Sequence, residues 1–320
     1  MRRLAAAALV AVLVGAAGSA ASRPLPAAYA SPTWSPDGKE IAFLRAWGPS
    51  GAIMLAGSSN LRRRVVVRTK ILFQVAWSPT GDRIAYAASD GAFVIRRDGT
   101  RRTRLGPGAD LAWSPDGSML AFDSSSGGPI RLVRPDGTGR RAVTRGRYDS
   151  SPAWSPDGRS LVFARSPSAG ADPWLYTVGA RGTGLRALGV QGFAPSWSPN
   201  GARLAYWRRT REGVALAVSD ADGRNERTLT RSLAAFSGPP RWSPDGKRLL
   251  FVVCSGFGAC RIDVADADSG FVTRLGSGSD ATWAPDGARI AFSARRFCGS
   301  ARVFVMNADG SDVRGLVPCA

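Results

Sequence analysis

Two kinds of side chain in this sequence could bind or transform a ligand: arginine guanidinium groups and aspartate carboxyl groups. The strongest arginine candidate is the segment 207–211, where Arg208, Arg209 and Arg211 follow Trp207. Guanidinium groups bind carboxylates and phosphates through paired hydrogen bonds, and an aromatic ring adds a stacking surface. The segment could hold a carboxylate, a phosphate or an acidic glycan. Its alternative interpretation is a solvated loop in an arginine-rich protein.

Two aspartates, Asp110 and Asp280, each stand three residues before a tryptophan, and Asp149 lies nearby in register. Paired carboxyl groups roughly 5 to 10 Å apart perform acid–base catalysis in glycosidases. The alternative is that these aspartates are structural or solvated. The choice between the two depends on how the fold positions them.

Histidine is absent from all 320 residues. This excludes Ser-His-Asp and Cys-His nucleophiles, histidine-ligated zinc or copper, and imidazole proton transfer. An enzyme with this sequence would depend on carboxylates, lysine, tyrosine or arginine. We expect no cofactor and no metal site.

The net charge of +19 is compatible with an anionic partner. The N-terminus, however, has the features of a secretory signal peptide over residues 1–20: Arg2 and Arg3, an apolar stretch over 4–17, and small residues at 18–20, with a second candidate cleavage site at 28–30. We therefore predict a secreted, periplasmic or envelope-associated protein without a nucleic-acid partner. The apolar stretch is shorter than a membrane-spanning helix needs, so we expect no transmembrane segment in the mature chain.

An internal repeat identifies the elements that position these groups. The pentapeptide Trp-Ser-Pro-Asp-Gly, or a close variant, recurs about every 40 residues. Each copy continues to an aliphatic residue seven positions after the tryptophan and an aromatic residue nine positions after it. The seven copies begin at Trp34, Trp77, Trp113, Trp154, Trp197, Trp242 and Trp283.

Each copy of the pentapeptide predicts a β-hairpin. Proline followed by aspartate and glycine favours a type I turn that a left-handed glycine closes, and such a turn joins antiparallel strands. A third and a fourth strand complete each repeat. Four antiparallel strands at this period form a propeller blade. We predict an all-β, seven-bladed β-propeller of four-stranded antiparallel blades over residues 31–320, with blades starting near 31, 74, 110, 151, 194, 239 and 280.

The repeat resembles that of the TolB-like, WD-repeat-like propeller family, whose hallmark is this turn followed by Ile-Ala-Phe, as at residues 41–43. The resemblance covers residues 31–320 and implies a role in binding envelope partners. TolB itself has an α/β domain ahead of six blades, whereas we expect seven blades and no such domain in this chain. The related oligogalacturonate lyases use metal-binding histidines, and prolyl-oligopeptidase-like enzymes need a catalytic histidine; both are absent here.

The resemblance places the seven tryptophans at the ends of the channel-lining strands and gives them, with the turn aspartates, a structural role. Blades three and seven are almost opposite in such a ring, so a structural role is favoured for Asp110 and Asp280. Ligand sites are expected on the face opposite the turns. The link 231–240, with Leu233 and Phe236, either contacts a partner or packs on its own blade.

The four cysteines suggest two disulfides in an exported chain. Cys254 and Cys260 flank a short hairpin loop, and Cys298 and Cys319 lie on one face of the last blade. We predict the pairs Cys254–Cys260 and Cys298–Cys319.

The sequence therefore predicts an exported, monomeric, non-catalytic propeller that acts as a binding scaffold in the cell envelope. Its partner would be an envelope protein or an anionic cell-surface polymer. The alternative function is that of a carboxylate-dependent hydrolase or lyase acting on an anionic polysaccharide, with the arginines of segment 207–211 binding the substrate.

Overall fold

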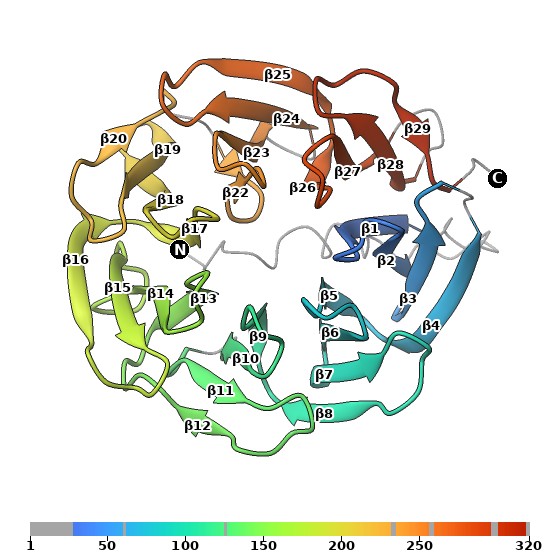
Figure 1. Cartoon of the computed structure of the whole chain (residues 1–320), viewed down its shortest axis with the longest axis horizontal. Helices are drawn as coiled ribbons and strands as arrows, with labels where there is room; N and C mark the ends of the chain where they lie inside the picture. Colours follow the sequence, from blue (N-terminus) through green and yellow to red (C-terminus); the bar gives the residue numbers. More distant parts are fainter. Residues whose placement is uncertain are drawn as a thin grey trace, which may run out of the picture.

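The computed structural model describes residues 28–59, 62–124, 127–231, 235–255, 259–295 and 300–317. These residues form seven antiparallel sheets arranged as blades in a ring, with the innermost strand of each blade nearest the ring axis (Figure 1); we call the region along this axis the channel. No helix occurs in these ranges. The prediction of an all-β, seven-bladed β-propeller is confirmed. Residues 1–20, the predicted signal peptide, lie outside the described residues.

The strands of each blade follow one another from the channel outwards. Blades one to three consist of β1 (Ala28–Trp34), β2 (Glu40–Trp47), β3 (Ser50–Gly57) and β4 (Arg63–Lys70); β5 (Leu72–Trp77), β6 (Arg83–Ala88), β7 (Gly91–Arg96) and β8 (Thr103–Gly106); β9 (Ala109–Trp113), β10 (Leu120–Asp123), β11 (Arg131–Val133) and β12 (Arg141–Ala142). Blades four and five consist of β13 (Asp149–Trp154), β14 (Ser160–Arg165), β15 (Trp174–Gly179) and β16 (Arg186–Gln191); β17 (Phe193–Trp197), β18 (Arg203–Thr210), β19 (Gly213–Asp220) and β20 (Arg227–Thr228).

The sixth blade differs from the others because its innermost strand is split into two segments. Both β21 (Ala235–Phe236) and β22 (Arg241–Trp242) pair with β23 (Arg248–Ser255), which is followed by β24 (Ala259–Asp266) and β25 (Val272–Ser277). The seventh blade is regular and consists of β26 (Ser279–Trp283), β27 (Arg289–Ala294), β28 (Arg302–Asn307) and β29 (Arg314–Gly315).

The repeated turn holds itself together by local hydrogen bonds, as the first copy shows. The Ser35 hydroxyl donates to the Asp37 carboxylate at 2.6 Å and accepts the Glu40 N–H at 2.9 Å, while Lys39 N–H also donates to Asp37. The Ser35 and Lys39 hydrogen bonds lower the pKa of Asp37. The glycine that closes each of the seven turns has φ between 67° and 74°, a conformation that glycine adopts without strain. These contacts give the turn aspartates a structural role.

Each core lies between two neighbouring blades. The ring closes in the same way, because Trp34, Ile41 and Phe43 of blade one share a buried cluster with Ala291 and Val303 of blade seven. One backbone hydrogen bond, from Tyr29 N–H to the Ala301 carbonyl at 3.0 Å, also crosses this junction. Every sheet consists of consecutive strands, so side-chain packing and not strand exchange joins the ends of the ring.

A disulfide joins Cys254 and Cys260, which are directly paired residues of β23 and β24. It links the two strands at the end of their hairpin. Cys298 and Cys319 lie outside the described residues, so the second predicted pair remains a prediction.

Candidate functional site

Polar side chains occupy the position three residues before the tryptophan in five of the seven blades, and we call them the belt; Ala194 and Pro239 hold this position in blades five and six. The innermost strands are irregular here, and five of the seven residues at this position have positive φ although they are not glycine: Ser31, Asp110, Ser151, Ala194 and Asp280. In blade two, Gln74 occupies this position and its amide bonds to both the N–H and the carbonyl of Leu111 in blade three. The irregular backbone at this position therefore directs side chains of the belt towards the neighbouring blade.

Asp280 uses this geometry to contact blade one. Its carboxylate accepts the backbone N–H of Ser31 at 3.3 Å and a weaker bond from the Ser279 hydroxyl at 3.4 Å. Burial within the ring raises the pKa of Asp280, and the Arg241 guanidinium opposes that rise. Arg241 is exposed to solvent, while the surrounding protein lowers the pKa of its guanidinium group and Asp280 raises it. Asp280 thus bridges the last and first blades.

Asp110 belongs to a carboxyl pair with Asp123. Ser151 of blade four donates its hydroxyl to Asp110 and its backbone N–H to Asp123, both at 3.2 Å. Burial raises the pKa of both carboxyl groups, and the charge of Asp110 raises that of Asp123 further, to about 8. Two neighbouring carboxyl groups that both resist ionisation share a proton readily. This pair joins blade three to blade four.

Asp149 does not contribute to the channel. Its side chain is fully buried and forms a two-point ion pair with Arg165, with distances of 2.6 and 2.9 Å. The Gly146 N–H donates a third hydrogen bond to it at 3.1 Å. Asp149 is therefore a structural residue of blade four.

The structure does not bring the candidate aspartates together. Asp110 lies in β9 and Asp280 in β26, which stand on opposite sides of the channel in Figure 1. Within the described ranges, no group of three or more Cys, Asp or Glu residues could hold a metal ion. The carboxyl pair that forms, Asp110 and Asp123, is not the one that the sequence analysis considered.

The arginine-rich segment 207–211 is not a loop. Residues 207–210 continue β18, and Trp207 is fully buried, where it packs on Phe236 and Phe251 and donates its indole N–H to the Gly238 carbonyl at 2.8 Å. As a correction to the sequence analysis, Trp207 is a core residue between blades five and six, because strand alternation turns it inwards. Phe236, from the link 231–240, also packs there.

The three arginines of this segment occupy different environments. Arg208 lies 3.6 Å from Glu226, and Arg209 forms an ion pair with Asp172 at 2.8 Å. Arg211 is exposed in the turn between β18 and β19. Two of the guanidinium groups thus have acidic partners, and the segment does not form a single converging site.

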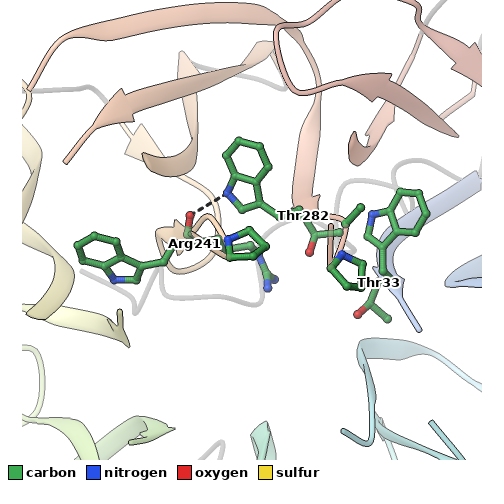
Figure 2. Close-up of a pocket in the computed structure, with 9 residues that line it drawn as sticks. Thr33, Arg241 and Thr282 are labelled. Atoms are coloured by element: carbon green, nitrogen blue, oxygen red, sulfur yellow. Dashed lines mark hydrogen bonds between the residues drawn. The ribbon is translucent and has the colours of Figure 1, made fainter. Parts of the chain in front are cut away.

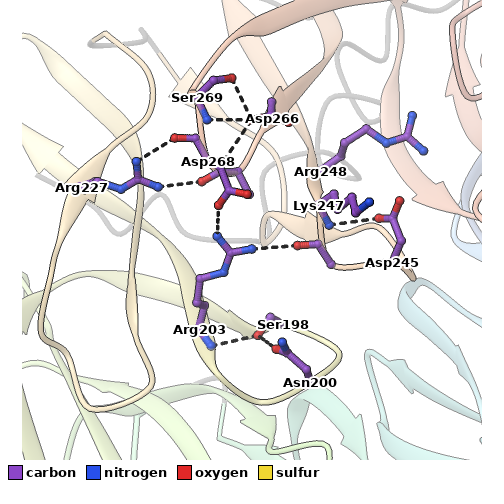
Figure 3. A network of polar contacts seen from close by, with 12 residues as sticks. Ser198, Asn200, Arg203, Arg227, Asp245, Lys247, Arg248, Asp266, Asp268 and Ser269 are labelled. Atoms are coloured by element: carbon purple, nitrogen blue, oxygen red, sulfur yellow. Dashed lines mark hydrogen bonds and ion pairs between the residues drawn. The ribbon is translucent and has the colours of Figure 1, made fainter.

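Arginine also joins blades five and six on the turn face (Figure 3). Arg203 pairs with the Asp268 carboxylate at 2.6 Å and donates to the Gly246 carbonyl at 3.0 Å, while Arg227 donates to the Asp268 carbonyl at 2.7 Å. The Arg203 guanidinium carbon also lies 5.0 Å from the centroid of the Trp242 ring. Some of the arginines of this chain therefore form ion pairs and hydrogen bonds that join neighbouring blades.

The tryptophans make a repeated contact around the ring. At six junctions, the indole N–H donates to the carbonyl of the residue before the preceding blade's tryptophan, at 3.1 to 3.3 Å, as Trp77 does to Thr33. Trp34 differs: its buried Nε1 has no hydrogen-bond partner among the described residues. The exception falls at the junction between blades seven and one, which we call the seam.

A pocket of about 250 Å³ opens beside the seam (Figure 2). Its walls carry three indoles, two turn prolines and one guanidinium group, supplied by Trp34, Trp242, Trp283, Pro244, Pro285 and Arg241; Thr33, Thr282 and Ala284 complete it. We call this the seam pocket. It lies on the turn face, whereas the family resemblance predicts ligand sites on the opposite face. A guanidinium group beside aromatic walls can bind an oxygen acceptor.

Neither the seam pocket nor Asp123 is among the candidate sites that the sequence predicts. Asp123 had a detectable signal: it stands ten residues after Trp113, where five of the other copies carry Leu, Ala, Trp or Val and one carries Ser. The seam pocket had no such signal, because Trp34 has the same local sequence as the other tryptophans. Among the residues that the structure covers, no helix is long and apolar enough to cross a membrane.

The fold and the ring of turns define this chain as a β-propeller protein. A family model described as the TolB beta propeller domain matches residues 25–239 and 192–317, and the chain belongs to this family. No curated protein matches the chain at the sequence level.

Solved structures share the fold at low sequence identity. TolB from Acinetobacter baumannii is 18% identical with a TM-score of 0.58, and the match covers 80% of this chain but only 65% of that one. An oligogalacturonate lyase in complex with manganese is 14% identical, with a TM-score of 0.70 and coverage of 87% and 90%. A puromycin-hydrolyzing peptidase from Mycobacterium tuberculosis is 16% identical, with a TM-score of 0.72 and coverage of 92% and 53%.

Proposed function

We propose that this chain is a non-catalytic binding scaffold of the cell envelope and that its partner binds at the seam pocket. The observation that carries the proposal is the seam pocket, where Arg241 stands among three tryptophans. Trp34, which lines the pocket, also has a buried N–H group without a partner among the described residues. A guanidinium group beside aromatic walls binds an oxygen acceptor, so the partner presents a carboxylate or carbonyl oxygen to Arg241.

The use of the channel aspartates supports binding rather than catalysis. Asp280 accepts a hydrogen bond from Ser31, and Asp110 and Asp123 accept hydrogen bonds from Ser151. Each of these contacts joins two blades. Carboxyl groups in such positions stabilise the ring and leave no separated acid and base for a substrate.

The location in the envelope rests on two features. The Cys254–Cys260 disulfide suits an oxidising compartment outside the cytoplasm. Residues 1–20 have the composition of a secretory signal peptide. TolB-type propellers share this fold. The partner of this chain is proposed from the seam pocket and not from that likeness.

A second candidate function is a hydrolase or lyase that acts on an anionic polysaccharide. The structural similarity to an oligogalacturonate lyase favours it. The raised pKa of Asp123, about 8, would keep that carboxyl group protonated near neutral pH and able to act as an acid. This candidate requires that cleavage depend on Asp123.

Site-specific photo-crosslinking in intact cells tests the binding proposal. Lys247 is exposed on the turn that also carries Pro244 of the seam pocket, so a photoreactive residue placed there lies beside a bound partner. We expect one discrete adduct, which the additional change Arg241→Ala removes. Glu212, exposed in the turn after β18, is the matched control position and should give no such adduct. Equal adducts at both positions, or an adduct that persists with Arg241→Ala, would contradict binding at the pocket.

A further inference from the structure

A second cationic site lies far from the seam pocket, at the outer side of the junction between blades two and three. It consists of Arg104 in β8, Arg131 in β11 and Arg140 immediately before β12. These strands neighbour each other along the lower rim of the ring in Figure 1. We call the three residues the rim cluster.

Two glycines let the guanidinium groups of the rim cluster approach the backbone. A methyl group on Gly106 would stand 3.0 Å from the guanidinium carbon of Arg140, and one on Gly91 would stand 3.4 Å from Nε and Nη2 of Arg104. The same methyl group on Gly91 would stand 2.9 Å from the Gly106 carbonyl oxygen, so the two glycines are adjacent. Arg104 and Arg140 therefore lie over one patch of side-chain-free backbone.

An aromatic ring lies beneath the cluster. The Arg140 guanidinium carbon is 5.4 Å from the centroid of Phe122, a fully buried residue of the core between blades two and three. Arg131 is the direct cross-strand partner of Phe122, so its side chain lies on the same face of blade three. All three arginines therefore face the same junction.

The rim cluster has no acidic partner in the described part of the chain. None of the ion pairs found there includes Arg104, Arg131 or Arg140. Arg104 donates to Asp90, but to its backbone carbonyl and not to its carboxylate, at 2.9 Å. Burial is the largest cause that lowers the pKa of Arg140, and the like charges of Arg131 and Arg104 lower it further. Arg165, Arg203 and Arg209, in contrast, each have an aspartate partner.

We propose that Arg104, Arg131 and Arg140 form an anion-binding site for the carboxylate or sulfate groups of an acidic polysaccharide. Three guanidinium groups without a carboxylate offer a set of donors that an oxyanion satisfies while it relieves their repulsion. The site is separate from the seam pocket, so it does not depend on the partner proposed there.

The shape of the rim favours an extended polymer. The strands β4 and β8 contain no acidic residue. Exposed basic residues continue from the cluster along β4 and up to the start of β8: Arg63, Arg64, Arg68, Lys70 and Arg102. These strands follow the curved outer edge of the ring (Figure 1). A flexible polysaccharide can follow this curve, whereas a flat membrane surface touches a convex rim over a short length only.

Binding of fluorescently labelled polygalacturonate and dextran sulfate to the purified chain, followed by fluorescence anisotropy, tests the site. The triple variant Arg104→Gln, Arg131→Gln, Arg140→Gln should bind at least one of these polymers about tenfold more weakly or worse. The matched control removes the same charge from other exposed rim positions, Arg181→Gln, Arg186→Gln, Arg274→Gln, and should stay within about twofold of the unmodified chain because it leaves the site intact.

Equal losses in the two triple variants would show attraction by net charge alone and would overturn the proposal, as would unchanged binding of both polymers. Stronger binding to vesicles of anionic lipid than to either polymer, lost in the first variant only, would overturn the polysaccharide assignment. Removal of three mutually repelling charges should leave the melting temperature equal or higher, so a folding defect does not obscure the result.

Discussion

The Arg289 guanidinium carbon lies 4.8 Å from the centroid of the Trp34 ring, so a cation–π contact joins the last blade to the first. Arg248 makes the equivalent contact with Trp283, also at 4.8 Å, between blades six and seven. The seam therefore keeps the stacking contact that the junctions between blades five and six and between blades six and seven have, while Trp34 lacks the indole hydrogen bond that the other repeat tryptophans make. This combination leaves a closed ring with an unpaired donor at its seam pocket.

The first prediction concerns the indole hydrogen bond. Trp77→Phe should lower the free energy of unfolding by about 1 kcal/mol more than Trp34→Phe does, because only Trp77 loses a hydrogen bond. Both residues are similarly buried, so the loss of ring volume is matched. Chemical denaturation of the two variants measures the difference. Equal losses would mean that Trp34 also has an acceptor.

The second prediction concerns closure of the ring. Arg289→Gln should weaken the seam by about 0.5 to 1 kcal/mol and increase amide hydrogen exchange in β1 and β28, which face each other there. Arg248→Gln removes the same kind of contact at another junction and serves as the control. Faster exchange of β1 in the control variant would contradict a local role of Arg289.

The third prediction follows from the raised pKa of Asp123. Because the folded pKa of about 8 lies above the ordinary 3.8, the folded chain keeps a proton that the unfolded chain releases between these values. The stabilisation is complete below pH 3.8 and is lost as the pH rises towards 8 and beyond, with a slope of at most about 1.4 kcal/mol per pH unit. Asp123→Asn should flatten this slope in denaturation curves measured from pH 5 to 8. A variant with an unchanged slope would assign the pH dependence elsewhere.

The fourth prediction contrasts a buried ion pair with an exposed one. Asp149→Asn leaves the Arg165 guanidinium without its buried partner and should cost about 3 to 5 kcal/mol of stability. Asp172→Asn breaks the exposed pair with Arg209 and should cost less than about 1 kcal/mol. Thermal unfolding of the two variants compares them. Similar losses would mean that burial does not decide the strength of these pairs.

The blade architecture could be predicted from the sequence because its signals are local. Within one repeat, the proline, aspartate and glycine of the turn fix the hairpin, and the Ser35–Asp37 and Ser35–Glu40 hydrogen bonds join residues at most five positions apart. Seven copies then require a ring. The strand order and the structural role of the turns followed from this repetition.

The candidate site could be predicted only in part, because it depends on contacts between distant residues. Trp207 differs from its prediction because the neighbouring Arg208 and Arg209 indicate a loop, while the strand buries Trp207 against Phe236 and Phe251. The seam pocket arises where residues more than 200 positions apart meet, and no feature near Trp34 in the sequence reports the missing hydrogen bond.

Incubation of the purified chain with polygalacturonate tests the central claim, binding without catalysis, most directly. The polymer's length distribution and the number of new reducing or unsaturated ends are measured at pH 5 and pH 8. The account predicts that the polymer stays intact at both pH values, because the channel carboxyl groups are engaged between blades. Cleavage that Asp123→Asn abolishes would contradict it and would establish the carboxylate-dependent enzyme instead.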